Sequence, residues 1–208
     1  MRWFRRTPLG DARWVVIDCE TSGLDPKRDR LLSVGAVSVR GSRIALAEAY
    51  GALIGQTQPS TRENIAIHGI GGEAQRTGRA AKEVLRELGE FSGSGIPAAF
   101  HAPFDAEILR RASKAAGAPT LPRRWLDLAE LAPALYPARR PAPRTLEHWL
   151  GRFGIAPQAR HDALGDALAT AQLLLVLLGA AARQGIEHAE DLMAAAAAGR
   201  WLGETRST

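Results

Sequence analysis

The chain has 208 residues, a length that suits one compact domain with a continuous apolar core. Hydrophobic residues make up 46% of it and charged residues 24%, which excludes the composition of an intrinsically disordered chain. A formal net charge of +5 favours a polyanionic partner. Solvated surface charge explains the same balance, so the charge by itself does not identify a nucleic-acid-binding protein.

The cysteine content and the apolar segments further restrict the class of protein to which the chain can belong. Cys19 is the only cysteine, which excludes an internal disulfide and a cysteine-based zinc cluster and favours the reducing cytoplasm. Residues 1–13 are basic without an apolar h-region, so we expect a loose arm and not a secretory signal. The apolar stretch Ala167–Ala182 is short and contains Thr170 and Gln172. It predicts a buried core helix and no membrane partner.

Three apolar runs near the start of the chain predict strands, with the second and third joined as a hairpin across residues 40–42. The runs are Trp14–Asp18, Leu31–Val39 and Ile44–Ile54. Residues 59–72 show no clear period and contain three glycines, which predicts a loop.

Strand and helix alternate in the rest of the chain. Pro103 starts a helix that runs to about Ala116, directly after a short buried strand at 98–100. Further helices are expected at 79–91, 145–153, from about 162 onward and at 190–198, with a proline-rich loop at 133–143. An antiparallel start followed by this alternation predicts an α/β protein whose mixed sheet is flanked by helices.

Two carboxylates stand at the end of the first predicted strand. Asp18 and Glu20 are two residues apart, so strand alternation points both to one side and Cys19 to the other. Because neighbouring like charges repel, a bound cation is the natural compensation. For this pair taken alone, a solvated turn is the competing interpretation.

Other acidic residues stand at two predicted helix starts. Asp105 lies in the first turn of the helix that Pro103 begins, where it also suits the helix dipole without any further role. If Asp162 caps the long helix, His161 lies just outside it and Asp166 about one turn inside. Alternatively, these three are surface residues of an ordinary helix start.

Four carboxylates and one histidine thus come from three separate regions, each next to a predicted strand end or helix start. All-carboxylate ligation suits Mg²⁺ or Mn²⁺, whereas zinc prefers nitrogen and sulfur. Two such ions roughly 3.5 to 4 Å apart can activate a water and stabilise the leaving oxygen of a phosphodiester.

Three ordered motifs resemble those of the DEDDh 3′-to-5′ exonucleases, which include the proofreading epsilon subunit of bacterial DNA polymerase III. The motifs are Asp18-Cys-Glu-Thr-Ser-Gly-Leu24, Ala102-Pro-Phe-Asp105 and His161-Asp-Ala-Leu-Gly-Asp166. Secondary matches extend the resemblance from Trp14 to about Leu178, and they include Ile67-His68-Gly-Ile70, Trp125-Leu-Asp127-Leu and Thr145-Leu-Glu-His-Trp-Leu150.

The resemblance implies a ribonuclease-H-like fold with a mixed five-stranded sheet, the fifth strand being at residues 125–128. It divides the chain into a basic arm at 1–13, an exonuclease domain at 14–184 and a C-terminal helix and tail at 185–208. We expect His68 to bond within its own loop and Asp127 to cap the helix that follows it. Trp125, Trp149 and Trp201 are interpreted as packing residues in preference to base-stacking platforms.

The resemblance also implies roles for individual residues. The implied ligands of two Mg²⁺ or Mn²⁺ ions are Asp18, Glu20, Asp105 and Asp166, with Glu20 in the catalytic set beside His161 as general base. The implied substrate-binding residues are Thr21, Ser22, Gly23, Leu24, His101 and Phe104. Leu24 packs against the 3′-terminal base. His101 departs from the Asn common in the family, whereas Ser22 keeps the hydroxyl of the usual Thr.

The activity implied is hydrolysis of nucleic acid, with DNA bearing a free 3′ end as substrate and nucleoside 5′-monophosphates as products. A DNA polymerase or repair protein is the implied protein partner. Two alternatives remain open: an RNA-processing exoribonuclease, and a non-catalytic subunit that keeps the fold as a scaffold for a polymerase or repair partner.

Overall fold

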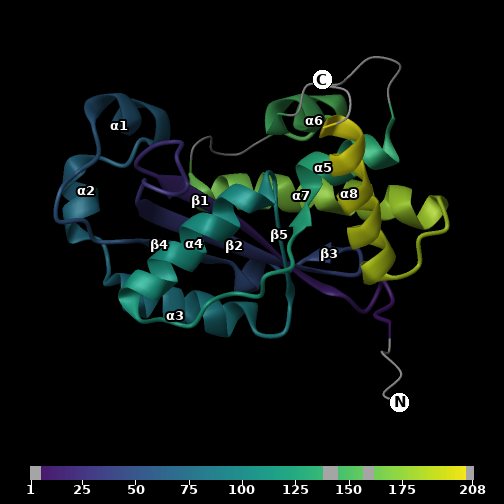
Figure 1. Cartoon of the computed structure of the whole chain (residues 1–208), viewed down its shortest axis with the longest axis horizontal. Helices are drawn as coiled ribbons and strands as arrows, with labels where there is room; N and C mark the ends of the chain where they lie inside the picture. The colour runs from purple at the N-terminus through teal and green to yellow at the C-terminus, as the bar shows by residue number, and fades with distance from the viewer. Residues whose placement is uncertain (1–5, 138–144, 157–161, 205–208) are drawn as a thin grey trace.

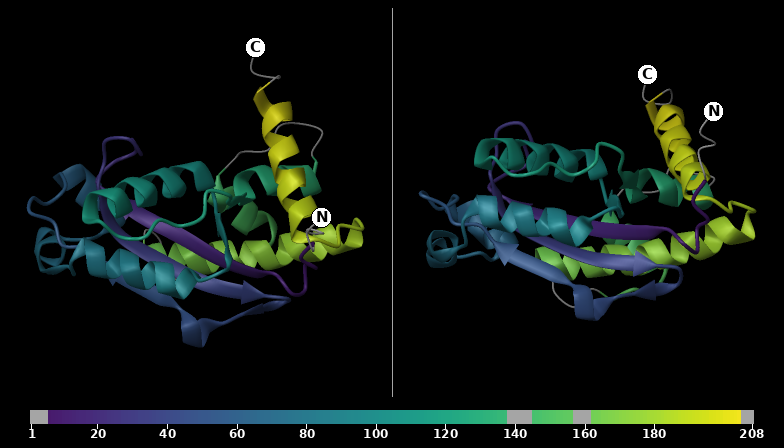
Figure 2. Two further views of the ribbon diagram at one scale, coloured as in Figure 1. Left: turned by 60° about the horizontal axis from the view of Figure 1, so that its bottom comes forward. Right: turned by 90° about the horizontal axis from the view of Figure 1, so that it is seen from below.

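A mixed sheet with helices on both faces organises the computed structural model, which describes residues 6–137, 145–156 and 162–204 (Figures 1 and 2). The strand order is β3-β2-β1-β5-β6, with β4 also paired to β2. β1 runs antiparallel to β2, while β5 is parallel to both β1 and β6. The strands are β1 (Arg13–Thr21), β2 (Leu31–Arg40), β3 (Arg43–Ile44), β4 (Tyr50–Leu53), β5 (Ile96–Ala99) and β6 (Leu126–Asp127).

The expected α/β architecture is confirmed, although the described sheet has six strands where five were expected. The difference arises because the third predicted strand, Ile44–Ile54, is interrupted by a 3-10 turn, η1 (Leu46–Glu48). β3 and β4 flank this turn and both pair with β2. Residues 45–49 are Ala-Leu-Ala-Glu-Ala, none of which is β-branched or aromatic, so they favour a helical turn.

Eight helices in the described chain surround the sheet. Odd-numbered residues of β1, such as Val15 and Ile17, pack with apolar residues of α3 and α4. Even-numbered residues, such as Trp14 and Val16, pack with α5, α7 and α8 on the other face. The helices are α1 (Arg62–His68), α2 (Gly72–Thr77), α3 (Ala81–Ser92), α4 (Ala102–Ala116), α5 (Leu128–Leu135), α6 (Leu146–Arg152), α7 (Ala163–Arg183) and α8 (Ala189–Glu204).

The predicted loop at residues 59–72 is wrong, because α1 and the start of α2 lie within it. Thr61 caps α1 by accepting a hydrogen bond from the backbone N–H of Asn64, and Gly69 ends the helix at φ 69°. α1 has seven residues, which is too short for an apolar period to emerge. Local capping therefore defines a helix that hydrophobic patterning does not.

α7 is the one helix in the described part that is long and apolar enough to cross a membrane by length and composition. Leu173, Leu174 and Leu177 are fully buried in the main core, and the helix packs against β1 and β2. These contacts confirm the expected core helix.

The described part of the N-terminal arm packs against the C-terminal segment. The backbone N–H of Thr7 donates to the carboxylate of Glu190 at 3.1 Å, and that of Leu9 donates to the Glu187 carbonyl at 2.8 Å. Ala12 and Leu192 are buried in the same core. Residues 6–12 and α8 are therefore packed onto the central fold.

Candidate active site

The first carboxylate pair lies where β1 ends. In the antiparallel register, Asp18 faces Gly35 of β2 and Glu20 faces Ser33, and the pairing shifts between Glu20 and Thr21. Residues paired in this way share a face of the sheet, so Asp18 and Glu20 lie on the face that α7 covers. Cys19 points to the opposite face, where it packs near the α3 and α4 cluster, as the alternation predicted.

Gly35 allows the start of α7 to approach the sheet beside Asp18. A Cβ atom built on Gly35 would lie 2.3 Å from the Ala163 carbonyl and 2.3 Å from the Leu164 nitrogen, which no side chain permits. A glycine inside an apolar strand often marks such a backbone approach. The absence of a side chain at this position therefore sets the depth at which the first turn of α7 lies.

The first turn of α7 is held by its cap. The carboxylate of Asp162 accepts a hydrogen bond from the Gly165 N–H at 2.9 Å, which confirms Asp162 as the N-cap. Asp166 lies one turn into the helix, and its backbone N–H donates to the Asp162 carbonyl. His161, the expected general base, lies outside the described residues, immediately before this cap.

Three carboxylates converge at this point. Oxygen atoms of Asp18, Glu20 and Asp166 all lie within 4.8 Å of one another. Burial raises the pKa of Asp18 well above its usual range, and the negative charges of Asp105, Glu20 and Asp166 raise it further. Burial and the charges of Asp166 and Asp162 raise the pKa of Glu20 to about 7. A divalent cation would relieve both the desolvation and the repulsion, so the donor set fits a hard, oxygen-preferring metal.

Asp105, the fourth expected ligand, belongs to α4, which packs on the other face of the sheet. It lies in the first turn of α4, is 5% exposed, and is hydrogen-bonded by the thiol and backbone of Cys19. Burial raises the pKa of Asp105 to about 7 even though these hydrogen bonds lower it. In the described structure Asp105 is outside the group of three converging oxygens, but its charge acts on Asp18.

His101 caps α4 with left-handed backbone, at φ 62° and ψ 47°, the one positive φ of a non-glycine residue in the described chain. Its backbone N–H donates to Oδ1 of Asp127 at 3.1 Å. The same oxygen accepts from the Ala129 N–H at 3.1 Å, which confirms the predicted capping of α5 by Asp127. Because His and Asn both tolerate left-handed backbone, the conformation accommodates the histidine found where the related family has Asn.

A loop after β1 carries the expected substrate-binding residues and exposes Leu24, whose relative exposure is 90%. The hydroxyl of Thr21 donates to the Gly23 carbonyl at 2.6 Å. The hydroxyl of Ser22 donates to Asp29 at 2.9 Å and accepts from the Arg30 N–H at 2.9 Å. The turn therefore uses the polar groups of Thr21 and Ser22 internally and leaves the apolar Leu24 at its tip.

Two helices brace this loop from outside. The side-chain amide of Asn64 in α1 donates to the Ser22 carbonyl, and Arg111 in α4 donates to the carbonyls of Pro26 at 2.8 Å and Asp29 at 2.9 Å. Neither bracing residue was predicted from the sequence, because neither lies in a recognisable motif. Phe104, also expected at the substrate site, is partly buried and packs against the α3 and α4 cluster.

His68 has the structural role expected of it. Its Nδ1 accepts from the Ile70 N–H at 3.0 Å, and its Nε2 lies 3.2 Å from the Ser60 hydroxyl. Burial lowers the pKa of His68, which favours the neutral ring that the hydrogen bond accepted by Nδ1 requires. His68 thus connects α1 to the segments that flank it.

Comparison of the sequence with known protein families identifies the family to which the chain belongs. A family model described as exonuclease (RNase_T) matches residues 15–174, which include the converging carboxylates. The chain belongs to this exonuclease family. Membership confirms the resemblance of the motifs and assigns the domain to the nucleases, which are hydrolases.

Two curated relatives are named after DNA polymerase III. The DNA polymerase III PolC-type protein of Thermotoga maritima is 33% identical over 184 residues, covering 88% of this chain and 13% of that protein. The DNA polymerase III subunit epsilon-like protein of Rhodobacter capsulatus is 34% identical over 182 residues, covering 86% of this chain and 26% of that protein. The chain therefore spans about a quarter or less of the length of these relatives.

Solved exonucleases share the fold. Exonuclease I of E. coli in complex with a dT13 oligonucleotide superimposes with a TM-score of 0.71 at 19% identity, over 84% of this chain and 42% of that one. The nuclease domain of 3′hExo, a DEDDh family member bound to rAMP, gives 0.69 at 14% identity, over 81% of this chain and 92% of that one. These likenesses confirm the exonuclease fold.

Replacing Gly35 by Ala tests whether the close approach of α7 to β2 positions the carboxylates or only contributes to packing. The added methyl group must displace the start of α7, so we expect a loss of about 1–3 kcal/mol in unfolding free energy and a much larger proportional loss in turnover. Urea unfolding and kcat measure the two effects. Gly51→Ala is the matched control, because its Cβ would lie 3.4 Å from the flexible Leu164 side chain. Equal effects of both variants would contradict the proposed constraint.

The raised carboxylate pKa values predict how the metal-free protein responds to pH. Because the folded state binds these protons more tightly than the unfolded state, their contribution to stability is present below the ordinary carboxylate pKa. It is lost as pH rises toward the folded values of about 7 for Glu20 and Asp105. In chelator, the melting temperature should fall across this window, and Asp18→Asn should flatten the fall. Stabilisation by added Mn²⁺ should grow over the same range. If the stabilisation by Mn²⁺ does not change with pH, metal binding is not coupled to the ionisation of these carboxylates, and the prediction is wrong.

Proposed function

We propose that the chain is a divalent-metal-dependent 3′-to-5′ exonuclease that hydrolyses DNA from a free 3′ end and releases nucleoside 5′-monophosphates. The observation that carries the proposal is the convergence of Asp18, Glu20 and Asp166 within 4.8 Å at the end of β1. Membership of the exonuclease family supports it, since the matched region contains all three residues.

The proposed cofactor is a pair of Mg²⁺ or Mn²⁺ ions held by Asp18, Glu20, Asp105 and Asp166. When bound, such ions activate water and stabilise the leaving oxygen of a phosphodiester. The carboxylates themselves supply only oxygen donors, which suits these hard cations better than zinc. Burial and mutual repulsion, which raise the pKa values of Asp18 and Glu20, make these carboxylates costly to ionise without a cation, and this supports the proposed metal site.

The protein's own contributions are proton transfer and positioning. We assign His161 as the general base, because it directly precedes the α7 cap Asp162 in the sequence and matches the position of the base in the motif that the chain shares with the DEDDh exonucleases. The braced loop presents Leu24 to the 3′-terminal base, and Thr21, Ser22 and Gly23 shape its backbone. His101 and Phe104 complete the proposed substrate site from the start of α4.

DNA is the proposed substrate because the two relatives are DNA polymerase III components and Exonuclease I was solved with a DNA oligonucleotide. The DNA polymerase III relatives support a DNA polymerase as the proposed partner, and a repair protein is the alternative. The proposed location is the cytoplasm. The second candidate is an exoribonuclease, which the complex of 3′hExo with rAMP favours. A non-catalytic scaffold is the third, and it predicts no turnover of any nucleic acid.

One set of assays tests these functions against each other. End-labelled single-stranded DNA, duplex DNA and RNA are incubated with the protein in chelator, Mg²⁺ or Mn²⁺. We expect ladder-like shortening from the 3′ end of DNA, restored by either metal, with Asp18→Asn and Asp166→Asn inactive but folded. Faster shortening of RNA than of DNA would support the exoribonuclease instead. Full activity in excess chelator would overturn the metal-dependent mechanism. Absence of activity on all three substrates would support the non-catalytic scaffold.

The proposed base has its own prediction. His161→Ala should lower kcat by roughly 10²- to 10⁴-fold while metal affinity and DNA binding change little. Turnover of the wild type should rise through the pKa of His161 as the ring becomes neutral, and this acidic limb should flatten in the variant. His188→Ala is a suitable control, since His188 lies next to α8 in the core-packed C-terminal segment. Wild-type turnover in His161→Ala would remove this histidine from the mechanism.

A further inference from the structure

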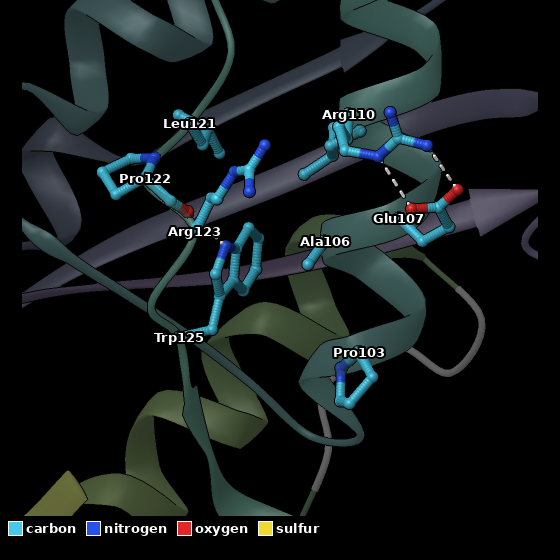
Figure 3. A pocket seen from close by; sticks show the side chains of 9 residues that line it. Pro103, Ala106, Glu107, Arg110, Leu121, Pro122, Arg123 and Trp125 are labelled. Carbon is cyan, nitrogen blue, oxygen red and sulfur yellow. Dashed lines mark hydrogen bonds and ion pairs between the residues drawn. The ribbon is translucent and has the colours of Figure 1, made fainter.

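A pocket of about 420 Å³ lies between α4 and the loop that leads into β6 (Figure 3). One wall comes from the outward flank of α4, with Pro103, Ala106 and Arg110, and the other from the loop, with Arg123 and Trp125. The volume falls in the range of small-ligand sites, roughly 300 to 1,000 Å³. None of the residues that line it belongs to the carboxylate cluster.

Trp125 forms an apolar, flat surface in this pocket. Its indole N–H donates to the Pro122 carbonyl at 2.9 Å, which fixes the orientation of the ring. The residue is partly buried, and part of its surface packs against the α3 and α4 cluster. Its remaining surface lines the pocket together with Leu121 and Ala106. A ring already fixed in place loses little conformational entropy when a planar ligand stacks on it.

The charge at the rim of the pocket is positive. Arg110 is paired with Glu107 at 2.7 and 2.8 Å, so those two charges offset each other. In the described part of the chain Arg123 has no acidic partner within ion-pair distance, and its side chain points across the pocket toward α4 (Figure 3). An uncompensated guanidinium beside an aromatic surface suits a ligand that combines a planar ring with an anion.

The pocket and Asp105 share the N-terminal end of α4 but lie on different sides of the helix. Pro103, which lines the pocket, is exposed, whereas Asp105, two residues later, is buried. From Pro103 to Arg110 the pocket extends seven residues, about 10 Å at 1.5 Å per residue. A strand whose 3′ end lies at the carboxylates therefore has to pass round the first turn of α4 to reach this surface.

We propose that this pocket binds a nucleotide of the substrate strand upstream of the scissile bond, with the base on Trp125 and a phosphate on Arg123. The inference rests on the proposed exonuclease function and adds a second contact to it. An acidic peptide would also satisfy Arg123, but a flat aromatic wall next to the proposed nuclease site favours a nucleotide. The pocket thereby adds affinity for a strand and contributes nothing to hydrolysis of a single nucleotide ester.

Two substrates of different length test this assignment, because only the longer one can contact the pocket. A labelled oligothymidylate extends beyond the active site, whereas the p-nitrophenyl ester of thymidine 5′-monophosphate occupies only the position of the 3′ nucleotide. Arg123→Glu should raise KM for the oligonucleotide roughly fivefold or more and leave kcat/KM for the ester unchanged. Trp125→Phe should have a smaller effect, because it keeps an aromatic surface. Arg43→Glu is the matched charge control, because Arg43 is exposed in β3 at the opposite end of the sheet.

Binding in chelator gives a readout independent of turnover. Fluorescence anisotropy with the same oligonucleotide should show weaker binding by Arg123→Glu and a shallower dependence of log affinity on log salt, by about 0.7 for one lost phosphate contact. Oligonucleotide KM and salt dependence equal to those of Arg43→Glu would overturn the proposal, as expected for a peptide site. Equal losses on oligonucleotide and ester would also overturn it, because they indicate a structural role. Wild-type protein inactive on both substrates would refute the proposed function itself.

Discussion

The close approach of α7 to β2 at Gly35 is the constraint on which the rest of the site depends. Asp18 is paired with Gly35 across the sheet, and the backbone of Ala163 and Leu164 lies over that glycine. Any side chain there would push the helix start outward and separate Asp166 from Asp18. The carboxylate cluster therefore results from backbone packing before any charge interaction is considered, and the repulsion within it is imposed by the fold.

A site assembled in this way needs firm supports on each contributing segment. Asp162 caps α7, while Asp127 accepts backbone hydrogen bonds at the starts of both α4 and α5. Asn64 and Arg111 fix the loop that exposes Leu24. Each of these supports is a hydrogen bond between a side chain and a backbone group, so none of them uses the carboxylate oxygens of Asp18, Glu20 or Asp166.

Sequence patterns predicted those parts of the site that depend on local geometry. Strand alternation placed Asp18 and Glu20 on one face, and cap chemistry placed Asp162 at the start of α7. The patterns failed where short segments decide the structure. α1 has only seven residues, and the strand expected over Ile44–Ile54 is interrupted by an alanine-rich turn.

Contacts between residues that are distant in the sequence were also not predicted. Gly35 is a glycine inside an apolar strand, which indicates a close backbone approach, but its partner in α7 lies more than a hundred residues away in the sequence. The bracing by Asn64 and Arg111 is likewise visible only once the chain is folded, and the role of His161 rests on its motif, since it lies outside the described residues.

Anomalous X-ray scattering from crystals grown with Mn²⁺ would reveal directly whether the three converging carboxylates form a metal site. We expect an anomalous peak in contact with oxygen atoms of Asp18, Glu20 and Asp166, and its loss in crystals of Asp18→Asn. An ordered site without any peak at these oxygens, or Mn²⁺ bound only elsewhere on the protein, would contradict that expectation.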